Sequence, residues 1–286
     1  MPTGSVVDQA DIGTSASPPP FVRLPDLRNR FARRAARLGH LADGHPLGDY
    51  LALLARIAAA QQDALGRLGP GTMPAATGRT PLDHRAPRGD QGWLPVLRGM
   101  LADLRPDLTL PVDVEALADR VLAHDPRPDD LALAPFVHAA LEVWFTRMAA
   151  MLDPGDLGHE RSLTTCPACG ALPVASTVEA TGSLSGSRYL HCGLCGTAWH
   201  FLRVKCAVCE GTAGIAYHEI EGGGGAAKAE TCDGCGAYGK IFYLARDAAT
   251  DPVADDLATL GLDLLVGEAG WARAWPNPYL AAERPR

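Results

Sequence analysis

Eight cysteines between residues 166 and 235 constrain this 286-residue chain more than any other feature of its sequence. Every cysteine belongs to a C-x-x-C pair, and the pairs read CPAC, CGLC, CAVC and CDGC in chain order. They are Cys166/Cys169, Cys192/Cys195, Cys206/Cys209 and Cys232/Cys235. A shift of forty residues places the first two pairs onto the last two without a gap. This register predicts one small structural unit that is used twice.

Metal ligation explains the spacing. Two cysteines three residues apart can direct both sulfurs toward one point, and two such knuckles supply four thiolates at tetrahedral corners. Glycine follows the second cysteine of three pairs, where positive φ lets backbone N–H groups approach the sulfurs, but Glu210 takes this place in the third pair. We therefore predict one ion on the first four cysteines and another on the last four. Crossed pairing, in which the first knuckle joins the fourth and the second joins the third, is the structural alternative.

Two other uses of cysteine fit the sequence less well. Structural disulfides are typical of small secreted proteins, whereas this chain is long enough to bury an ample core and shows no signal peptide. A dithiol redox enzyme needs one active C-x-x-C beside a helix, not four equivalent pairs in a duplicated array. Four thiolates also saturate a tetrahedral ion, so the sites favour structure or electron transfer over hydrolysis, and we predict no catalytic residue.

Composition limits the partners of the chain. The formal net charge is −7, and thiolate-bound ions make it more negative, so nucleic acid is not an expected partner. No apolar run is long enough to cross a membrane, which predicts a protein without a membrane span. We expect a cytoplasmic protein whose thiols are kept reduced.

The region before the cysteines has helical periodicity. Residues 1–20 are rich in Ser, Thr, Gly and Pro and are predicted to form a disordered tail. Apolar positions then recur every three to four residues from Asp26, after Pro46, and in 93–104, 114–124 and 135–152, whereas 69–92 reads as a long surface loop. The segment 135–152 is apolar on most sides and is predicted to be the central helix of a bundle.

Two polar features of the helical region have a functional and a structural interpretation. Five arginines near the first helix could bind an anion, but a solvated helix face is the favoured interpretation. They are Arg28, Arg30, Arg33, Arg34 and Arg37. His138 and Glu142 stand one turn apart on the central helix, and we interpret them as a hydrogen-bonded polar pair in the core and not as a metal or acid–base site.

Around the cysteines the sequence changes to short β-prone segments. They are 172–178, 187–191, 199–204, 214–220 and 240–244. Histidines at 159, 191, 200 and 218 lie near the cysteines, but eight thiolates already fill two sites, so none is assigned as a ligand. Residues 251–265 are predicted to form one helix that packs back on the bundle, followed by an irregular strap.

These patterns predict an α+β fold: an N-terminal helical bundle followed by two small rubredoxin-like or zinc-ribbon-like metal units. Each unit can bury little apolar area alone, so its ion is expected to supply much of its folding free energy, and loss of a cysteine is expected to leave the helical half folded. The predicted parts are a tail at 1–20, a helical domain at 21–155, metal units at 156–205 and 206–246, and a C-terminal helix and strap at 247–286.

Long motifs in this order resemble the FdhE family of formate dehydrogenase accessory proteins. The resemblance is carried by CPACGALPVAS, SRYLHCGLCGTAWHFLRVKCAVCE, AETCDGCGAYGK and DPVADDLATLGLDLLVGEAGW, and FARRAARLGHLADGHPLGDYL near the N-terminus is similar too. It spans roughly residues 20 to 280. What it implies is a cytoplasmic assembly factor, not itself an enzyme, that binds iron in rubredoxin-like four-cysteine sites and contacts the catalytic subunit of formate dehydrogenase.

Two iron ions are thus the expected cofactors, on Cys166, Cys169, Cys192 and Cys195 and on Cys206, Cys209, Cys232 and Cys235, with zinc as the alternative because four thiolates accept both metals. Two other function classes stay open. A rubredoxin-like electron carrier requires iron that changes oxidation state. A zinc-ribbon module for nucleic acid requires a basic face, and residues 161–243 carry equal numbers of basic and acidic side chains, which argues against it.

Overall fold

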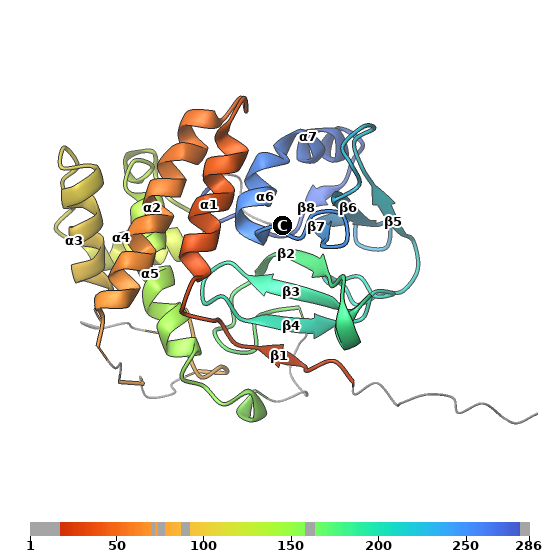
Figure 1. Ribbon diagram of the computed structural model, residues 1–286, viewed down its shortest axis with the longest axis horizontal. Helices are drawn as coiled ribbons and strands as arrows, with labels where there is room; N and C mark the ends of the chain where they lie inside the picture. Colours follow the sequence, from red (N-terminus) through yellow and green to blue (C-terminus); the bar gives the residue numbers. More distant parts are fainter. Residues whose placement is uncertain (1–17, 70–71, 74–77, 87–91, 158–163, 281–286) are drawn as a thin grey trace, which may run out of the picture.

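Residues 30–149 form a bundle of helices, as the apolar periodicity predicted (Figure 1). The computed structural model describes residues 18–69, 72–73, 78–86, 92–157 and 164–280. The helices of this part are α1 (Arg30–Ala42), α2 (Gly48–Arg67), α3 (Trp93–Leu104), α4 (Val114–Leu122) and α5 (Ala134–Ala149). Helix α5 contacts α2, α3 and α4 and is buried along nearly its whole length, which confirms it as the central helix.

Apart from one strand near the N-terminus, the mixed sheet is formed by the second half of the chain. Its strands are β1 (Val22–Arg23), β2 (Pro173–Val178), β3 (Arg188–Cys192), β4 (Ala198–Phe201), β5 (Ile215–His218), β6 (Ala227–Cys232), β7 (Ala237–Tyr243) and β8 (Ala272–Arg273). Short 3-10 turns lie at Pro128–Asp130, Pro154–Asp156 and Gly182–Leu184. A helical region followed by a region that consists mainly of strands confirms the α+β class.

The forty-residue repeat is visible in the strand order. Strands β2, β3 and β4 form one antiparallel meander, and β5, β6 and β7 form another. The two meanders join where β2 runs parallel to β7, which gives the order β1-β4-β3-β2-β7-β6-β5, with β8 beside β7. The two repeats therefore share one continuous sheet. Whether the predicted ranges are separate folding domains stays a prediction.

The sequence-based prediction missed strand β6. Its sequence, AKAETC, lacks the β-branched run that identified the other strands, and Ala, Lys and Glu favour helix. The strand forms because it is hydrogen-bonded to β5 on one side and to β7 on the other. The forty-residue register would have located it, since residues 188–192 of β3 fall on 228–232.

The C-terminal helical segment is two helices, not the single helix predicted over 251–265. Helix α6 (Pro252–Ala258) and helix α7 (Leu260–Glu268) meet at Thr259. The buried ammonium of Lys240, on β7, donates to the carbonyl oxygens of Asp256 and Thr259 at 2.7 and 3.1 Å. Because those carbonyls are then satisfied by a side chain, the first helix can end there. Helix α6 contacts both α1 and β2, so it lies between the bundle and the sheet.

The interpretation of the α1 arginines as a solvated face is wrong for Arg34 and Arg37, and Arg30 is half-buried as well. Arg34 is buried and binds Glu142 on α5 at 2.6 Å and Asp251, the first residue before α6, at 3.1 Å. Arg37 pairs with Asp247 and Asp255. The guanidiniums of Arg34 and Arg37 hold the first helix against the C-terminal segment. The periodicity of the first helix could not indicate this, because the partner carboxylates lie far away in the sequence.

The predicted surface loop 69–92 also has a buried part. Within the described residues 78–86, Leu82 is buried and its N–H donates to the carbonyl of Ala168 at 2.9 Å. The His84 N–H donates to the carbonyl of Cys169 at 3.0 Å, and His84 Nδ1 lies 2.8 Å from the same oxygen. This segment therefore packs on the first cysteine knuckle.

One large hydrophobic core runs through the bundle and the first meander, and a small second cluster lies between the second meander and α7.

Most of the predicted tail, residues 1–17, lies outside the described residues. The last residues of the predicted tail, 18–20, are described, and there the Pro20 carbonyl accepts a hydrogen bond from the Tyr189 hydroxyl, just before β1 pairs with β4. In the described part of the chain, none of the helices combines the length and apolarity that crossing a membrane requires.

Candidate metal centres

Each C-x-x-C pair forms the same tight turn. In the first pair, the Cys166 carbonyl accepts from the Gly170 N–H at 2.8 Å, and the Cys166 N–H donates to the Ala171 carbonyl at 2.8 Å. The left-handed φ of 77° at Gly170 lets the chain reverse there. Gly196 and Gly236 have φ of 75° and 68°, so the predicted role of glycine in these knuckles is confirmed.

Glu210 has the glycine conformation without being glycine. Its φ is 60°, its N–H donates to the Cys206 carbonyl at 2.9 Å, and the Cys206 N–H donates to the Gly211 carbonyl at 2.8 Å. The third knuckle thus keeps the geometry of the other three, although Glu210 stands where they have glycine. A side chain at such φ costs about 1–2 kcal/mol.

Replacing Glu210 with glycine is expected to make the third knuckle more stable than replacing it with alanine, by about 1 kcal/mol. Both substitutions remove the 3.5 Å ion pair with Lys205, so alanine is a matched control that keeps the strained φ. Metal release to a chelator, followed as a function of chelator concentration, measures the difference. Equal release from the two variants would show that the left-handed conformation is not strained at this position.

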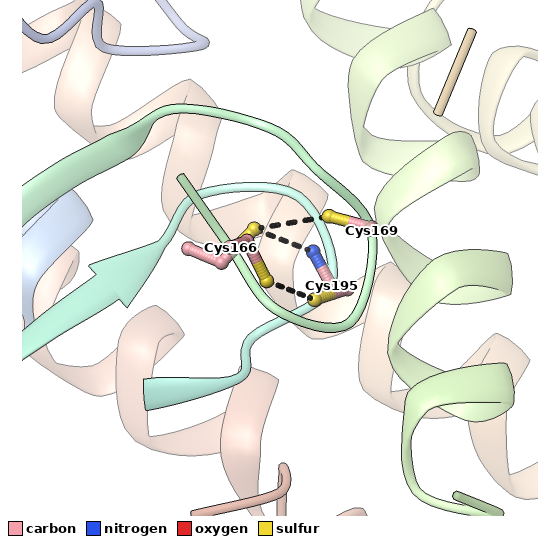
Figure 2. Close-up of side chains that lie close together, drawn as sticks. Cys166, Cys169 and Cys195 are labelled. Atoms are coloured by element: carbon pink, nitrogen blue, oxygen red, sulfur yellow. Dashed lines mark hydrogen bonds between the residues drawn. The ribbon is translucent and has the colours of Figure 1, made fainter. Parts of the chain in front are cut away.

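The sulfurs gather in two sequential clusters. Cys166 Sγ lies 3.5 Å from Cys195 Sγ, and Cys169 Sγ lies 3.5 Å from Cys192 Sγ. In the second cluster the distances are 3.8 Å for Cys206 to Cys235 and 3.8 Å for Cys209 to Cys232. Within each cluster all four sulfurs lie within 4.8 Å of one another, so the knuckles pair within each repeat and the crossed alternative is wrong. Figure 2 shows the sulfurs of Cys166, Cys169 and Cys195 directed toward one another.

These distances fit a tetrahedral ion. Metal–sulfur bonds of about 2.3 Å place the four sulfurs of a tetrahedron about 3.8 Å apart. The second cluster has this spacing and the first is slightly tighter. Disulfide bonds require sulfurs about 2.0 Å apart, and all eight cysteines are free. The residues present therefore suit four-thiolate metal binding.

The buried thiols of the first cluster need a cation to ionise together. Burial raises the pKa of Cys166 and of Cys169 well above the ordinary thiol value. Burial also opposes ionisation of Cys195, but side-chain hydrogen bonds with the neighbouring thiols and with Thr197 Oγ1, 3.2 Å away, hold the pKa of Cys195 well below that value. Four buried thiolates without a counter-charge would repel one another, whereas a divalent ion stabilises all four.

The first centre lies inside the protein. All four of its cysteines are buried in the large core, and the backbone N–H groups of Leu194 and Cys195 approach Cys192 Sγ at 3.4 Å. From the central helix, His138 Nε2 lies 3.2 Å from the Gly193 carbonyl. The knuckle is thus attached to α5, while residues 82–84 cover the other knuckle of the same centre.

The second centre faces solvent. Cys206 and Cys232 are buried, but Cys209 and Cys235 are exposed. A backbone hydrogen bond from Gly211 lowers the pKa of Cys209, and the Val208 N–H approaches Cys206 Sγ at 3.4 Å. Burial raises the pKa of Cys206 to about 12. The two centres therefore share one backbone design but differ in how easily another molecule can reach them.

The histidines near the cysteines are not part of either sulfur cluster in the described chain, as the sequence indicated. His191 Nε2 lies 2.8 Å from Thr177 Oγ1, and His218 Nε2 lies 3.1 Å from Thr231 Oγ1. The ring of His200 packs edge-on against Tyr189. His159 lies outside the described residues. The described rings of His191, His200 and His218 therefore each contact a neutral side chain of the sheet.

His138 and Glu142 are both buried, but they bind other partners and not each other in the described structure. His138 lies against the Gly193 carbonyl. The Glu142 carboxylate accepts from Arg34 at 2.6 Å, Gln61 at 3.0 Å and Tyr279 at 3.0 Å. The predicted core location is correct, whereas the predicted pair is replaced by long-range contacts of each residue with other parts of the chain.

Comparison with known proteins identifies this combination of a helical bundle and two sulfur clusters. Three family models match in chain order: "FdhE, N-terminal" at residues 19–161, "FdhE, central domain" at 165–203 and "FdhE, C-terminal domain" at 204–280. Together they span almost all of the described chain. The chain belongs to the FdhE family.

Relatives within the FdhE family match along nearly their whole length. Protein FdhE of Escherichia coli O9:H4 (strain HS) is 37% identical, with 96% of this chain and 97% of the relative covered. The FdhE homolog of Edwardsiella ictaluri is 42% identical, with 90% of each chain covered. The crystal structure of the FdhE protein from Pseudomonas aeruginosa superposes with a TM-score of 0.78 at 36% identity, covering 92% of this chain and 99% of that one. The FdhE resemblance in the motifs is thus confirmed in sequence and fold.

Proposed function

We propose that this chain is a cytoplasmic accessory protein that is required for the formation of active formate dehydrogenase and that binds the catalytic subunit of that enzyme. Membership of the FdhE family supports the role. The structural observation that best supports this accessory role is the pair of closed four-sulfur clusters. Four thiolates leave an ion no open position for substrate, which suits a protein that prepares an enzyme and does not itself oxidise formate.

The eight cysteines would hold two iron ions, with zinc as the alternative. When bound, such an ion would cross-link the two knuckles of its cluster. If the ion is iron, it would also provide one-electron redox chemistry. The buried first centre is suited to holding the sheet against α5. The second centre has two exposed cysteines, so it is the one that a client polypeptide could contact directly.

A deletion strain is expected to lose most or all formate dehydrogenase activity while still making the catalytic polypeptide. Formate oxidation is measured in the deletion strain and after complementation with the wild-type chain or with a Cys206→Ser, Cys209→Ser double variant. Wild type should restore activity, and the double variant should not, because it removes half of the ligands of the second centre. Normal activity in the deletion strain, with no second copy in the genome, would overturn the assembly function.

A rubredoxin-like electron carrier is the second candidate, and the exposure of Cys209 and Cys235 favours it because electron transfer requires an accessible centre. Voltammetry of the purified protein distinguishes the two functions. A reversible one-electron wave, together with normal assembly of formate dehydrogenase in the deletion strain, would support the carrier. Zinc at both centres would be redox silent and would exclude it.

A further inference from the structure

A polar cavity of about 290 Å³ lies where the bundle, the first meander and the C-terminal segment meet. Its walls come from the segment that leads into α1, from β2 and β3, from the loop after Cys195 and from the residues before α6. Lining side chains include Arg23, Asn29, Arg30, Arg33, Thr177 and His191. Figure 1 shows the first turn of α1 beside the loop that joins β3 to β4. The cavity borders the first metal centre but contains none of its ligands.

The carboxylates at this cavity are already neutralised. Each of the three has a guanidinium partner close by. The pairs are Asp26 with Arg28 at 2.7 Å, Glu179 with Arg23 at 2.9 Å, and Asp251 with Arg34 at 3.1 Å. Among the described ion pairs, none joins these three carboxylates to Arg30 or Arg33, the two remaining arginines of the cavity wall.

Arg30 is held in place but is only partly satisfied. Its Nη2 lies 3.6 Å from Glu142 Oε1, an oxygen that Arg34 binds at 2.6 Å. Its Nη1 donates weakly to the Gly196 carbonyl at 3.4 Å. The Arg30 Nε is buried, and within the described chain no acceptor is bonded to it. A buried N–H of a charged group without an acceptor is costly, so an acceptor brought by a ligand would be favourable there.

The guanidinium of Arg30 packs directly on the second knuckle. A Cβ added to Gly196 would lie 2.4 Å from Arg30 Cζ, so only glycine leaves room for this contact. Arg33, one turn along α1, is exposed beside the cavity and forms no ion pair with any described residue. One half-buried guanidinium, which shares the Glu142 carboxylate with Arg34, and one exposed guanidinium therefore line the same cavity.

We propose that this cavity binds the oxyanion of a small molecule, a carboxylate or a phosphate, through Arg30 and Arg33. Guanidinium groups bind both oxyanions by charge-assisted hydrogen bonds, and the side chain of Asn29 is a neutral donor at the same wall. The volume suits a small molecule and not a folded partner. This inference does not depend on the assembly function, since it concerns side chains outside both metal centres.

Calorimetric titration of the metal-loaded protein tests the proposal, with inorganic phosphate and acetate as the ligands at constant ionic strength. At least one of them should bind saturably, with a Kd of about 1 mM or tighter. The stronger ligand shows whether the natural anion is a phosphate or a carboxylate. Arg33→Gln should weaken its binding about tenfold or more, because one charge-assisted contact is lost. Arg30→Gln should weaken it at least as much.

Arg98→Gln is the matched control, because Arg98 is exposed on α3 and does not line the cavity. Its affinity for the anion should equal that of the wild type. Should Arg30→Gln fail to fold, Arg33→Gln decides the test, since Arg33 is exposed and holds no other element in place. Absence of saturable binding for both anions, or equal affinity in Arg33→Gln and wild type, would overturn the proposal.

Discussion

Replacing Cys169 with serine is expected to abolish metal binding at the first centre and to unfold the helical bundle together with it. Cys169 is fully buried in the core that the bundle and the first meander share. Its carbonyl also anchors His84. A structural four-cysteine site contributes about 10–16 kcal/mol of binding free energy, which equals or exceeds the about 5–15 kcal/mol that stabilises an ordinary protein. Far-UV circular dichroism together with metal analysis of the purified variant measures both losses.

Cys209→Ser is the matched control for this experiment. Cys209 is exposed, and its centre lies outside the large core. The variant should lose one ion and loosen β5 and β6 while most of the helical signal and the main unfolding transition persist. Retention of the bundle in Cys169→Ser as well would show that the metal units fold independently of it, as the sequence alone suggested.

Replacing Glu142 with glutamine is expected to lower the free energy of unfolding by about 3–5 kcal/mol. The Glu142 carboxylate is completely buried and binds Arg34 at 2.6 Å, while Gln61 and Tyr279 donate to its other oxygen. The amide keeps the shape but removes the charge, so the buried guanidinium keeps only Asp251 as a charged partner. Denaturant titration gives the change, and Asp63→Asn, at an exposed 4.0 Å pair with Arg67, should cost less than about 0.5 kcal/mol.

The pH dependence of stability provides an independent check on Glu142. Burial alone would raise the pKa of this carboxyl, but the Arg34 guanidinium and its neighbours hold the pKa below the ordinary value of 4.5. The carboxylate's contribution is therefore complete above pH 4.5 and is lost as the pH falls through the lower, folded pKa. Glutamine does not titrate, so the variant should lack this part of the acid destabilisation. An equal acid slope in both proteins would show that Glu142 is not charged in the folded state.

The cysteine knuckles were fully predictable from the sequence because their geometry is local. A C-x-x-C turn needs only a few residues and one left-handed position, and the forty-residue register gave the correct partners for all four turns. The central helix was equally clear, since a segment that is apolar on most sides has to lie inside a bundle. The FdhE motifs identified the family. Periodicity and cysteine spacing alone could not have identified it.

Long-range contacts decided the rest. Strand β6 exists because two neighbours are hydrogen-bonded to it, against the preference of its own residues. Arg34 is buried because two carboxylates from 108 and 217 residues away converge on it, and the break at Thr259 follows from the Lys240 ammonium of another element. None of these partners lies within the window that a periodicity argument covers.

The difference between the two metal centres is the clearest case of this division. The sequence determined the number of four-cysteine clusters, the cysteines in each and the turn at each cysteine pair, because these depend on spacing and backbone conformation alone. It presented the two repeats as equivalent. Only the tertiary structure buried the first centre under α5 and residues 82–84 and left the second open to solvent. Burial depends on what other parts of the chain pack against a unit, and a repeat contains no information about its surroundings.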